Sequence, residues 1–239
     1  MPQVIWHWSL SLLIPSLATY ICVADEAGSS DLQHRIRAFK TNMPIALDGD
    51  LAKWRGASTV RFEGKPLARH PRRATVYTLW DKENLYPFDV HSSKLQASVR
   101  EHDGDKLWED DGVEFLIDPL SHRAKEFLPD DFSYHINILN TVYDDRGTPS
   151  GQPDSRWNGN AQHAVRILDD YHYVIEVSVP WAEIGVEPVE GHTILGIDFA
   201  VNGKDPDTGA YDYFDWCGLK VFHEPSGFGK LLLAGRRSE

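Results

Sequence analysis

Cysteine is scarce in this sequence, with two residues in 239. One of them, Cys22, lies in an apolar N-terminal segment that we expect to be removed, which would leave Cys217 as the only cysteine. The mature chain would then have no intrachain disulfide. Its hydrophobic core must therefore supply the stability of the fold alone.

Positive charge is also in deficit. The sequence has 24 Lys and Arg against 36 Asp and Glu, which gives a net charge of -12 at pH 7. Nucleic acid, anionic membrane surfaces and sulfated or uronic-acid polymers would repel a protein of this charge. We therefore expect neutral ligands or cations as partners, and we do not expect nucleic acid.

The common sequence motifs of enzymes are absent. There is no G-x-S-x-G motif, phosphate-binding loop or dinucleotide fingerprint. The eleven histidines are scattered and include no H-x-H or H-x-x-x-H pair with a third ligand at tight spacing. They do not predict a catalytic metal centre.

The N-terminal segment has the pattern of a signal peptide. Residues 1–24 contain no Lys, Arg, Asp or Glu, and an apolar run from Leu10 to Ile21 precedes the sequence Cys22-Val23-Ala24. We therefore predict a signal peptide over 1–24, cut before Asp25. Only His7 stands where a basic residue is usual, so an uncleaved membrane anchor is the alternative. Either way we expect a secreted or periplasmic protein.

Beyond a polar lead-in at residues 25–40, short runs with strand-like alternation follow one another between turns. In one of them Val113, Phe115 and Ile117 alternate with polar Glu114 and Asp118. In the run 85–90, Pro87 removes a hydrogen-bond donor, which predicts an edge or bulged strand. The runs cover 74–80, 85–90, 113–118, 134–140, 161–168, 171–181, 193–202, 211–216 and 228–234.

The expected fold class is all-β. Helical signal is limited to one short turn after Pro180, and no linker or repeat divides the chain. A hydrophobic content of 41% is enough for a single core. We therefore predict one domain over residues 41–235, with the architecture of an antiparallel two-sheet β-sandwich.

Six segments follow one another in the order DGDLAKW, LWDKENLY, WEDDGVEFLID, VIEVSVPWAEIG, LGIDFAVN and FGKLLL. Together they resemble the family 9 carbohydrate-binding modules over about residues 45–234. YHINILNTVYD and FHEPSGFG are similar to the stand-alone secreted branch of that family. The resemblance implies a CBM9-like or DOMON-like β-sandwich without a catalytic centre, which binds a neutral oligo- or polysaccharide in polysaccharide catabolism.

The resemblance also implies a sugar slot between two aromatic side chains. The tryptophan of the family's W-E-x-D motif falls on Trp108, the acid of its V-E pair on Glu114, and the second aromatic on Phe222. Flat rings gain contact area on the apolar face of a pyranose, and a carboxylate accepts hydrogen bonds from two hydroxyls. Trp108 and Phe222 would therefore hold the sugar, and Glu114 would orient it.

Three positions depart from the family pattern. His135, Ala200 and Leu219 stand where the sugar-binding members carry an Arg, a Gln and an Asn. A ligand other than glucose or cellobiose, or a loss of binding, therefore stays open. Asn137 shares a strand face with His135 and is a candidate for the floor of the slot. Trp157, isolated in a polar loop, is the last candidate contact.

Each candidate also has a structural interpretation. Trp108 and Phe222 would seal the core, and Glu114 would be a solvated strand carboxylate in a structural or protein-binding sandwich. A glycoside hydrolase would use Glu114 with an unidentified second carboxylate about 5 to 10 Å away. A haem-binding relative would need a methionine ligand, and Met43 is the only one left after removal of residues 1–24, which disfavours haem.

Aspartates gather in two parts of the sequence, which are Asp103, Asp105, Asp110 and Asp111, and later Asp205, Asp207 and Asp212. Hard oxygen ligands at this density favour a structural Ca²⁺, which the resemblance also allows. Neither run fits the twelve-residue calcium loop, and acidic turns are common at this net charge. Calcium is the one candidate cofactor, and no feature indicates a particular oligomer.

Overall fold

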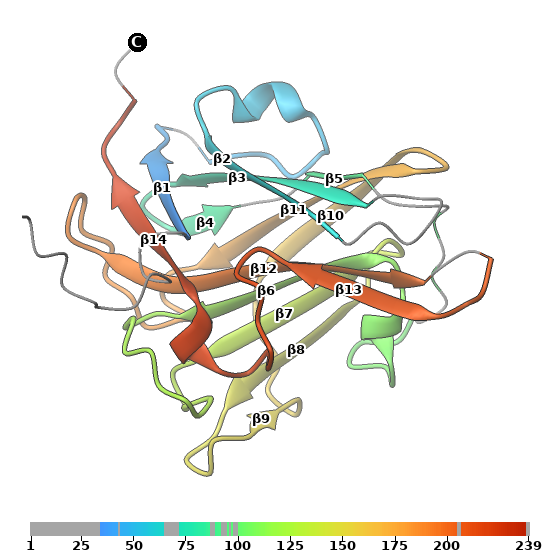
Figure 1. The fold of residues 1–239 in the computed structure, drawn as a ribbon. Coiled ribbons are helices and arrows are strands. Elements are labelled where there is room, and N and C mark those ends of the chain that lie inside the picture. The colour runs from blue at the N-terminus through green and yellow to red at the C-terminus, as the bar shows by residue number, and fades with distance from the viewer. Residues whose placement is uncertain are drawn as a thin grey trace, which may run out of the picture.

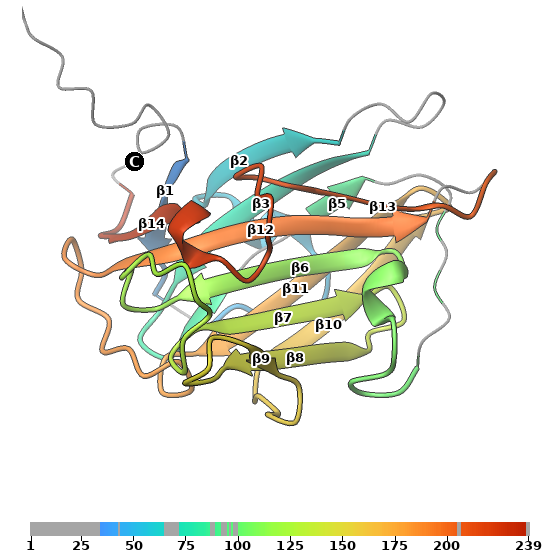
Figure 2. The same cartoon turned by 60° about the horizontal axis from the view of Figure 1, so that its bottom comes forward.

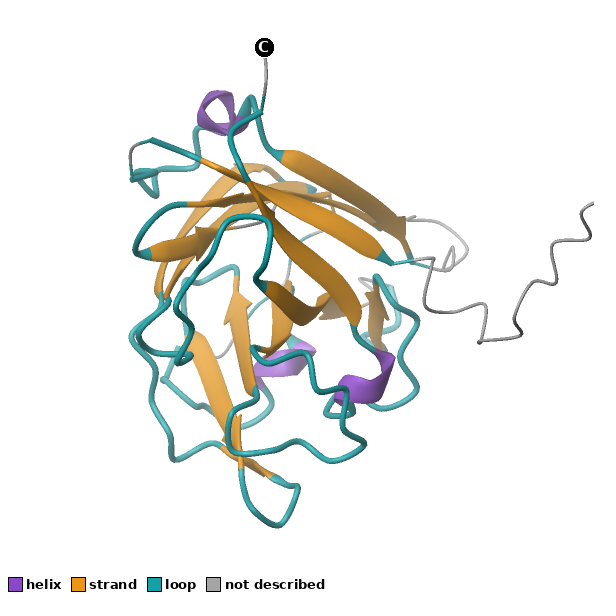
Figure 3. Ribbon diagram, turned by 90° about the vertical axis from the view of Figure 1, so that its left-hand side faces the viewer, coloured by secondary structure: helices purple, strands orange, loops and turns teal. Residues whose placement is uncertain are grey.

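A computed structural model describes residues 34–42, 44–64, 72–86, 89–91, 95, 97, 100–204 and 207–237. The predicted signal peptide at 1–24, Met43 and Asp205 lie outside the described residues. Among the described residues, helix is limited to three short 3₁₀ turns and strands dominate (Figure 3). No helix in this part of the chain is long and apolar enough to cross a membrane. The all-β class is confirmed.

The elements follow one another along the chain as shown in Figure 1. They are β1 Arg35–Lys40, η1 Leu51–Trp54, β2 Ser58–Glu63, β3 Arg73–Trp80, β4 Asn84–Tyr86, β5 Asp89–His91, η2 Leu107–Glu109, β6 Gly112–Asp118, β7 Phe132–Asn137, β8 Val142–Gly147, β9 Pro153–Asp154, β10 Gln162–Asp169, β11 His172–Pro180, β12 Ile194–Lys204, β13 Tyr211–Asp215, η3 Pro225–Gly227 and β14 Gly229–Ala234.

Within the described residues the strands form one continuous hydrogen-bonded sheet, in the order β10-β11-β4-β3-β1-β14-β12-β6-β7-β8-β9. β13 pairs with β12, β2 with β3, and β5 with both β11 and β3. The sheet curls so that β10 and β11 lie behind β6 and β7 (Figure 2). Between these two layers, the Tyr173 hydroxyl of β11 donates to the carbonyl oxygen of Gly112 on β6 at 3.1 Å. The core fills the space between the two layers.

The predicted antiparallel two-sheet sandwich needs correction. β1 pairs in parallel with both β14 and β3, so the sheet is mixed. Through these pairings β1 connects the two layers as parts of one continuous sheet. Residues 35–40, which the sequence analysis assigns to the lead-in, form β1 of this sheet. Ile36 and Ala38 of β1 are buried in the core, with 6% and 0% of their surface exposed. A strand so short, between basic residues, gave no alternating signal of its own.

Most of the expected strand runs are strands, with two differences. The run at residues 85–90 divides into β4 and β5, and because both pair with β3 and β11, neither lies at an edge. The turn after Pro180 does not form a helix. β2 was missed because its apolar residues alternate with charged or polar ones on a half-exposed surface. β8 was missed because its run Asp144-Asp145-Arg146 has no strand-like alternation of apolar residues.

Two of the segments that resemble the family meet at Glu176 of β11. Its buried carboxylate accepts hydrogen bonds from the Gly49 amide at 2.6 Å and from the Trp54 indole at 2.8 Å. Lys53 lies 3.4 Å from the same carboxylate. Gly49 has a φ of 73°, which glycine adopts without strain. The DGDLAKW segment is therefore a structural anchor for β11.

Candidate functional site

One face of the strands β13-β12-β6-β7-β8, which lie side by side in Figure 2, points away from the core. Successive residues of a strand point to opposite faces, and Val113, Phe115 and Ile117 belong to the core. Glu114 therefore points outwards, opposite Ala200 on β12 and His135 on β7. We call this surface the polar face, and its members include Tyr211, Tyr213, Asn202, Glu114, His135, Tyr143 and Asp145.

A chain of polar contacts crosses the polar face. The Tyr211 hydroxyl donates to Asn202 Oδ1 at 2.9 Å, and Asn202 Nδ2 lies 3.2 Å from His135 Nε2. Because an amide nitrogen can only donate, His135 Nε2 accepts and Nδ1 carries the proton. That nitrogen lies 3.6 Å from Glu114 Oε2. Burial lowers the pKa of His135 to about 3, so this contact is not an ion pair at neutral pH.

Glu114 is the central acid of the polar face. Its side chain keeps 12% of its surface exposed. Burial raises the pKa of Glu114 to about 7, a shift that His223 and a hydrogen bond with Asn202 oppose and the charge of Asp145 supports. Near neutral pH the carboxyl therefore exists in both protonation states, and it can accept or donate a hydrogen bond.

Asp145 and His223 form a second polar pair near Glu114. Asp145 is buried, accepts a hydrogen bond from Ser133 Oγ at 3.1 Å, and lies 3.4 Å from His223 Nε2. Burial alone would lower the pKa of His223, but the nearby carboxylates of Asp145 and Glu114 outweigh burial and raise it. His223 therefore favours the cationic form between two acids.

Aromatic rings stand on both sides of these polar groups. On the β8 side, the half-buried rings of Trp108 and Tyr143 meet edge to face with centroids 5.5 Å apart. On the β13 side, Tyr213 lies 4.9 Å from Phe222 and 5.8 Å from Tyr211. Tyr211 and Tyr213 expose 39% and 41% of their surface. Both predicted aromatic residues are thus partly exposed beside the polar face.

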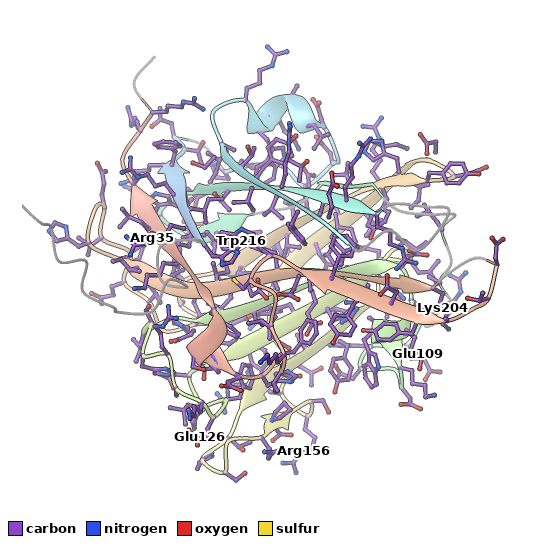
Figure 4. All side chains as sticks on the ribbon, viewed as in Figure 1. Arg35, Glu109, Glu126, Arg156, Lys204 and Trp216 are labelled. Atoms are coloured by element: carbon purple, nitrogen blue, oxygen red, sulfur yellow. The ribbon has the colours of Figure 1, made fainter. Side chains whose placement is uncertain are left out.

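The 3₁₀ turn η2 explains why Trp108 stands at the start of β6. Its neighbour Leu107 is fully buried and fixes the turn against the sheet. Glu109 lies 3.5 Å from Lys204 on β12 and 3.5 Å from Lys106, and Figure 4 shows Glu109 and Lys204 close together. The left-handed conformation of Lys106, with a φ of 61°, begins the turn. The ion pairs of Glu109 therefore hold the turn that carries Trp108.

The structure does not bring all the predicted residues together. Trp157 packs on Phe132 and Tyr134, with centroids 5.2 and 5.8 Å away, and these rings belong to the core. It therefore packs on the core side of β7, and not beside Glu114 and His135. Asn137 is buried and holds its own hairpin, donating to Asp110 and accepting from the amides of residues 139 and 141.

The two other departures from the family pattern have different surroundings. Ala200 is buried on the polar face between Glu114 and Asp215. Leu219 lies in a neighbouring loop, where its amide donates to Asp215 Oδ1 at 2.7 Å. It lines a cavity of about 330 Å³ together with Arg123 and Cys217. Neither residue supplies a hydrogen-bonding side chain to a ligand.

Sequence reasoning missed most of the polar and aromatic neighbours of Glu114. These are Tyr143, Asp145, Asn202, Tyr211, Tyr213 and His223. For Asn202, Tyr211 and Tyr213 a signal was present, because they alternate with core residues in strands that the sequence predicts. Tyr143 and Asp145 were lost because β8 was not predicted. His223 follows Phe222 directly, but a loop has no periodicity that would orient its side chain.

The aspartates proposed for calcium have separate roles. Asp103 lies near His102 and Asp144, while Asp110 accepts a hydrogen bond from Asn137. Asp205 lies outside the described residues, so the later run is incomplete. A second group of donor atoms, from Asp118, His122 and Asp131, contains none of the predicted residues. The calcium prediction stays a prediction.

The fold and the polar face define a class of protein, a β-sheet module that presents aromatic rings around polar groups on one outer face. Comparison with known sequences gives the family. The sequence model described as "Carbohydrate family 9 binding domain-like" matches residues 47–236, and the chain belongs to this family.

Relatives from characterised enzymes share the module over a small part of their length. The chain is 28% identical over 188 residues to endo-1,4-beta-xylanase A of Thermoanaerobacterium saccharolyticum, covering 77% of this chain and 15% of the enzyme. It is 30% identical over 168 residues to the exoglucanase XynX of Acetivibrio thermocellus, covering 69% of this chain and 14% of the enzyme. The similarity is therefore limited to about one seventh of the length of each enzyme.

Solved structures agree on the fold. A family 9 carbohydrate binding module from Caldicellulosiruptor kristjanssonii in complex with cellotriose has a TM-score of 0.66, at 22% identity over 85% of this chain and 95% of that one. Its complex with glucose has a TM-score of 0.64 at 21% identity, covering 85% and 98%. A putative carbohydrate-binding protein from Bacteroides uniformis has a TM-score of 0.64 at 13% identity, covering 83% and 98%.

Proposed function

We propose that this module binds a neutral saccharide on its polar face, without catalysing a reaction. Trp108 and Phe222 are the proposed sugar-stacking residues, with Tyr143 and Tyr213 beside them, and Glu114 accepts hydrogen bonds from sugar hydroxyls. The complexes of related modules with cellotriose and glucose support a β-glucan-type ligand. A role beside polysaccharide-degrading enzymes is the corresponding biological proposal.

The observation that carries the proposal is the juxtaposition of exposed rings with a nearly buried polar network. Rings on both sides of Glu114 offer flat apolar surface, and the partly exposed carboxyl of Glu114 offers a hydrogen-bonding group, with Asn202 and His135 buried beside it. A sugar has the same combination, apolar C–H faces and a rim of hydroxyls. Flat rings gain dispersion contact with such a ligand at small entropic cost.

The affinity should be modest. The rings are only half covered, so a bound sugar would stay partly in water and its ordering would offset part of the gain. We expect dissociation constants between micromolar and millimolar, which correspond to about 4 to 8 kcal/mol. Uncharged oligosaccharides fit the net charge of -12 better than uronic-acid polymers do.

Isothermal titration with cellotriose, glucose and xylotriose tests the proposal. Trp108→Ala should reduce the affinity for the best of these ligands at least 10-fold and change the unfolding temperature little, because the ring is half-buried at the surface. Tyr171→Ala is the matched control, since it removes an exposed ring, with 52% of its surface accessible, from the β10–β11 turn. The control should bind like the wild type.

Two results would contradict the proposal. One is a Trp108→Ala protein that binds as well as the wild type. The other is a protein that loses its cooperative unfolding, since the tryptophan would then belong to the core.

Hydrolysis of a glycosidic bond is the second candidate function. It is favoured by the raised pKa of Glu114, which suits a general acid, and by the charge of Asp145 acting on it. A retaining or inverting hydrolase needs two carboxyl groups about 5 to 10 Å apart. Incubation with oligosaccharides separates the two functions, because product formation that Glu114→Gln abolishes would replace the binding proposal with an enzymatic one.

The location outside the cytoplasm remains part of the proposal. It is supported by the apolar segment at residues 1–24 and by the kinds of enzyme that carry related modules. Mass spectrometry of the N-terminus of the exported protein would test it. A mature chain that begins at Asp25 is expected.

A further inference from the structure

A second group of side chains lies where β6 ends, at the opposite end of that strand from Trp108. Asp118 is the last residue of β6, Asp131 precedes β7, and His122 lies in the loop that joins the two strands. The carboxylates of Asp118 and Asp131 are fully buried, while His122 keeps 26% of its side chain exposed. One donor atom from each residue lies within 4.8 Å of the other two.

Asp131 has an oxygen whose hydrogen-bonding capacity is unused. Its Oδ2 accepts a hydrogen bond from the Leu128 amide at 2.6 Å, but Oδ1 is buried without a hydrogen-bond partner among the described residues. This oxygen points towards His122 and lies 3.7 Å from its Nε2. A buried carboxylate oxygen without a partner is costly, and a bound cation would remove that cost.

The charges of the group also favour a cation. Two fully buried carboxylates, from Asp118 and Asp131, face the same imidazole ring. Asp118 is held in place by the amides of His122 and Arg123, at 3.2 and 2.9 Å from its two oxygens. Asp130 extends the acidic surroundings, with its Oδ1 3.5 Å from His122 Nε2.

The donor atoms are close enough to share one ion, since one atom from each residue lies within 4.8 Å of the other two. Each ring nitrogen of His122 faces one carboxylate. Nδ1 lies 3.3 Å from Asp118 Oδ2, and Nε2 lies 3.7 Å from Asp131 Oδ1. A small shift of the ring would present one nitrogen to an ion between the carboxylates.

We propose that Asp118, His122 and Asp131 form a binding site for one divalent ion of the zinc type. An imidazole nitrogen with two carboxylates suits Zn²⁺ and related transition ions, whereas Ca²⁺ prefers an all-oxygen shell of six to eight ligands. The exposed edge of His122 leaves a fourth position for water. The site is distinct from the aspartate runs that the sequence suggested for calcium.

The ion would fix the loop between β6 and β7. Arg123 of this loop donates to the carbonyl oxygens of Ser226 at 2.8 Å and Phe228 at 3.2 Å. The Ser226 amide donates to the carbonyl oxygen of Ala124 at 2.7 Å. The loop is thus joined to the segment before β14, and the ion would stabilise both.

Metal titration of protein without a histidine tag, first treated with EDTA, tests the site. With ZnCl₂ at about 100-fold above the dissociation constant, the unfolding temperature of the wild type should rise by roughly 5–10 °C. His122→Ala and Asp131→Asn should each remove this rise and one equivalent of zinc in isothermal titration. His102→Ala is the matched control, because His102 lies beside two other aspartates, and it should respond like the wild type.

Asp131→Asn adds a test that is independent of added metal. The apo variant should unfold at the wild-type temperature or above it at pH 8, because it no longer buries a carboxylate. If this variant is folded and its unfolding temperature does not rise with zinc, the lost response reflects loss of the binding site and not unfolding of the loop.

Three results would overturn the proposal. The first is an unfolding temperature of the wild type that zinc does not change, as expected if His122 simply lies between the two acids without binding an ion. The second is a zinc response that survives in His122→Ala or disappears in His102→Ala. The third is an equal rise with CaCl₂ that His122→Ala retains, because the ion would then be calcium bound by oxygen alone.

Discussion

The two faces of the same strands differ sharply in chemistry. On β6 and β7, Phe115 stacks on Tyr134 with centroids 4.9 Å apart, and both rings are buried in the core. One residue along each strand, Glu114 and His135 turn to the other face, where 12% and 3% of their side-chain surface is exposed. The apolar face is what holds the fold together, whereas the polar face places ionisable groups where burial is unfavourable.

This difference teaches that the polar face is not simply a wet sheet surface. A half-exposed antiparallel sheet carries polar side chains in water, where they cost nothing. Here burial shifts the pKa of Glu114 to about 7 and that of His135 to about 3. The shift of Glu114 lowers the stability of the fold above about pH 4.5, and that of His135 lowers it below about pH 6.5. Retaining such groups makes sense where a ligand uses their hydrogen-bonding capacity.

The tryptophans show the same contrast. The Trp80 indole donates to the carbonyl oxygen of Ala234 at 2.8 Å, and the Trp181 indole donates to that of Asp81 at 3.0 Å. Both rings are buried. Trp108 instead stands half-buried against Tyr143 at the rim of the polar face. Of these three rings, only Trp108 offers surface to a ligand.

The largest expected effect comes from breaking the apolar face. Phe115→Ala removes a buried ring that packs on Tyr134, and it should lower the free energy of unfolding by about 3–5 kcal/mol. Urea denaturation at pH 7 measures this change. A loss below about 1 kcal/mol would mean that the core around β6 repacks freely. It would contradict the conclusion that the apolar face holds the fold together.

Glu114→Gln tests the polar face through the pH dependence of protein stability. The pKa of Glu114 in the folded protein is about 7, above its ordinary value of 4.5, so the folded state holds the proton more tightly than the unfolded chain. The cost is therefore absent below about pH 4.5, grows as the pH rises, and is complete above about pH 7. At pH 8 the variant should be more stable than the wild type by up to about 3 kcal/mol.

The difference between the two proteins isolates Glu114, because Asp131 titrates in the same pH range in both. Denaturation curves at pH 4.5 and pH 8 are sufficient. In the same variant the sugar affinity should fall about 10- to 100-fold, as expected for a lost hydrogen bond to a charged group. A variant that is less stable at pH 8 and binds sugar normally would assign Glu114 to the structure.

The sequence was a good guide where a pattern repeats. Alternation in β6 places Val113 and Phe115 inside and Glu114 outside, and the strands that contain Asn202 and Tyr213 have the same signal. The family motifs lead to the fold because their residues are structural, such as Trp54 on Glu176. Local periodicity and anchoring motifs together determine most of the strands.

The rest depends on contacts between distant parts of the chain. Trp157 looked exposed in a polar loop, but that loop folds back onto Phe132 and Tyr134. The approach of His122 to two aspartates depends on the conformation of the loop between β6 and β7, which has no periodicity. The parallel pairing of β1 depends on the closing of the whole sheet. No short sequence window contains this information.

The smallest expected effect concerns the contact chain across the polar face. Tyr211→Phe keeps the ring and removes the hydroxyl that donates to Asn202 Oδ1, so the stability should fall by about 1 kcal/mol. Sugar affinity should fall a few-fold, because Asn202 would be less firmly oriented towards His135. Tyr171→Phe, which changes an exposed tyrosine in the β10–β11 turn, should stay within about 0.5 kcal/mol of the wild type. If both variants behave alike in stability and binding, the hydroxyl of Tyr211 does not organise the face, and Glu114 and the rings alone would account for recognition.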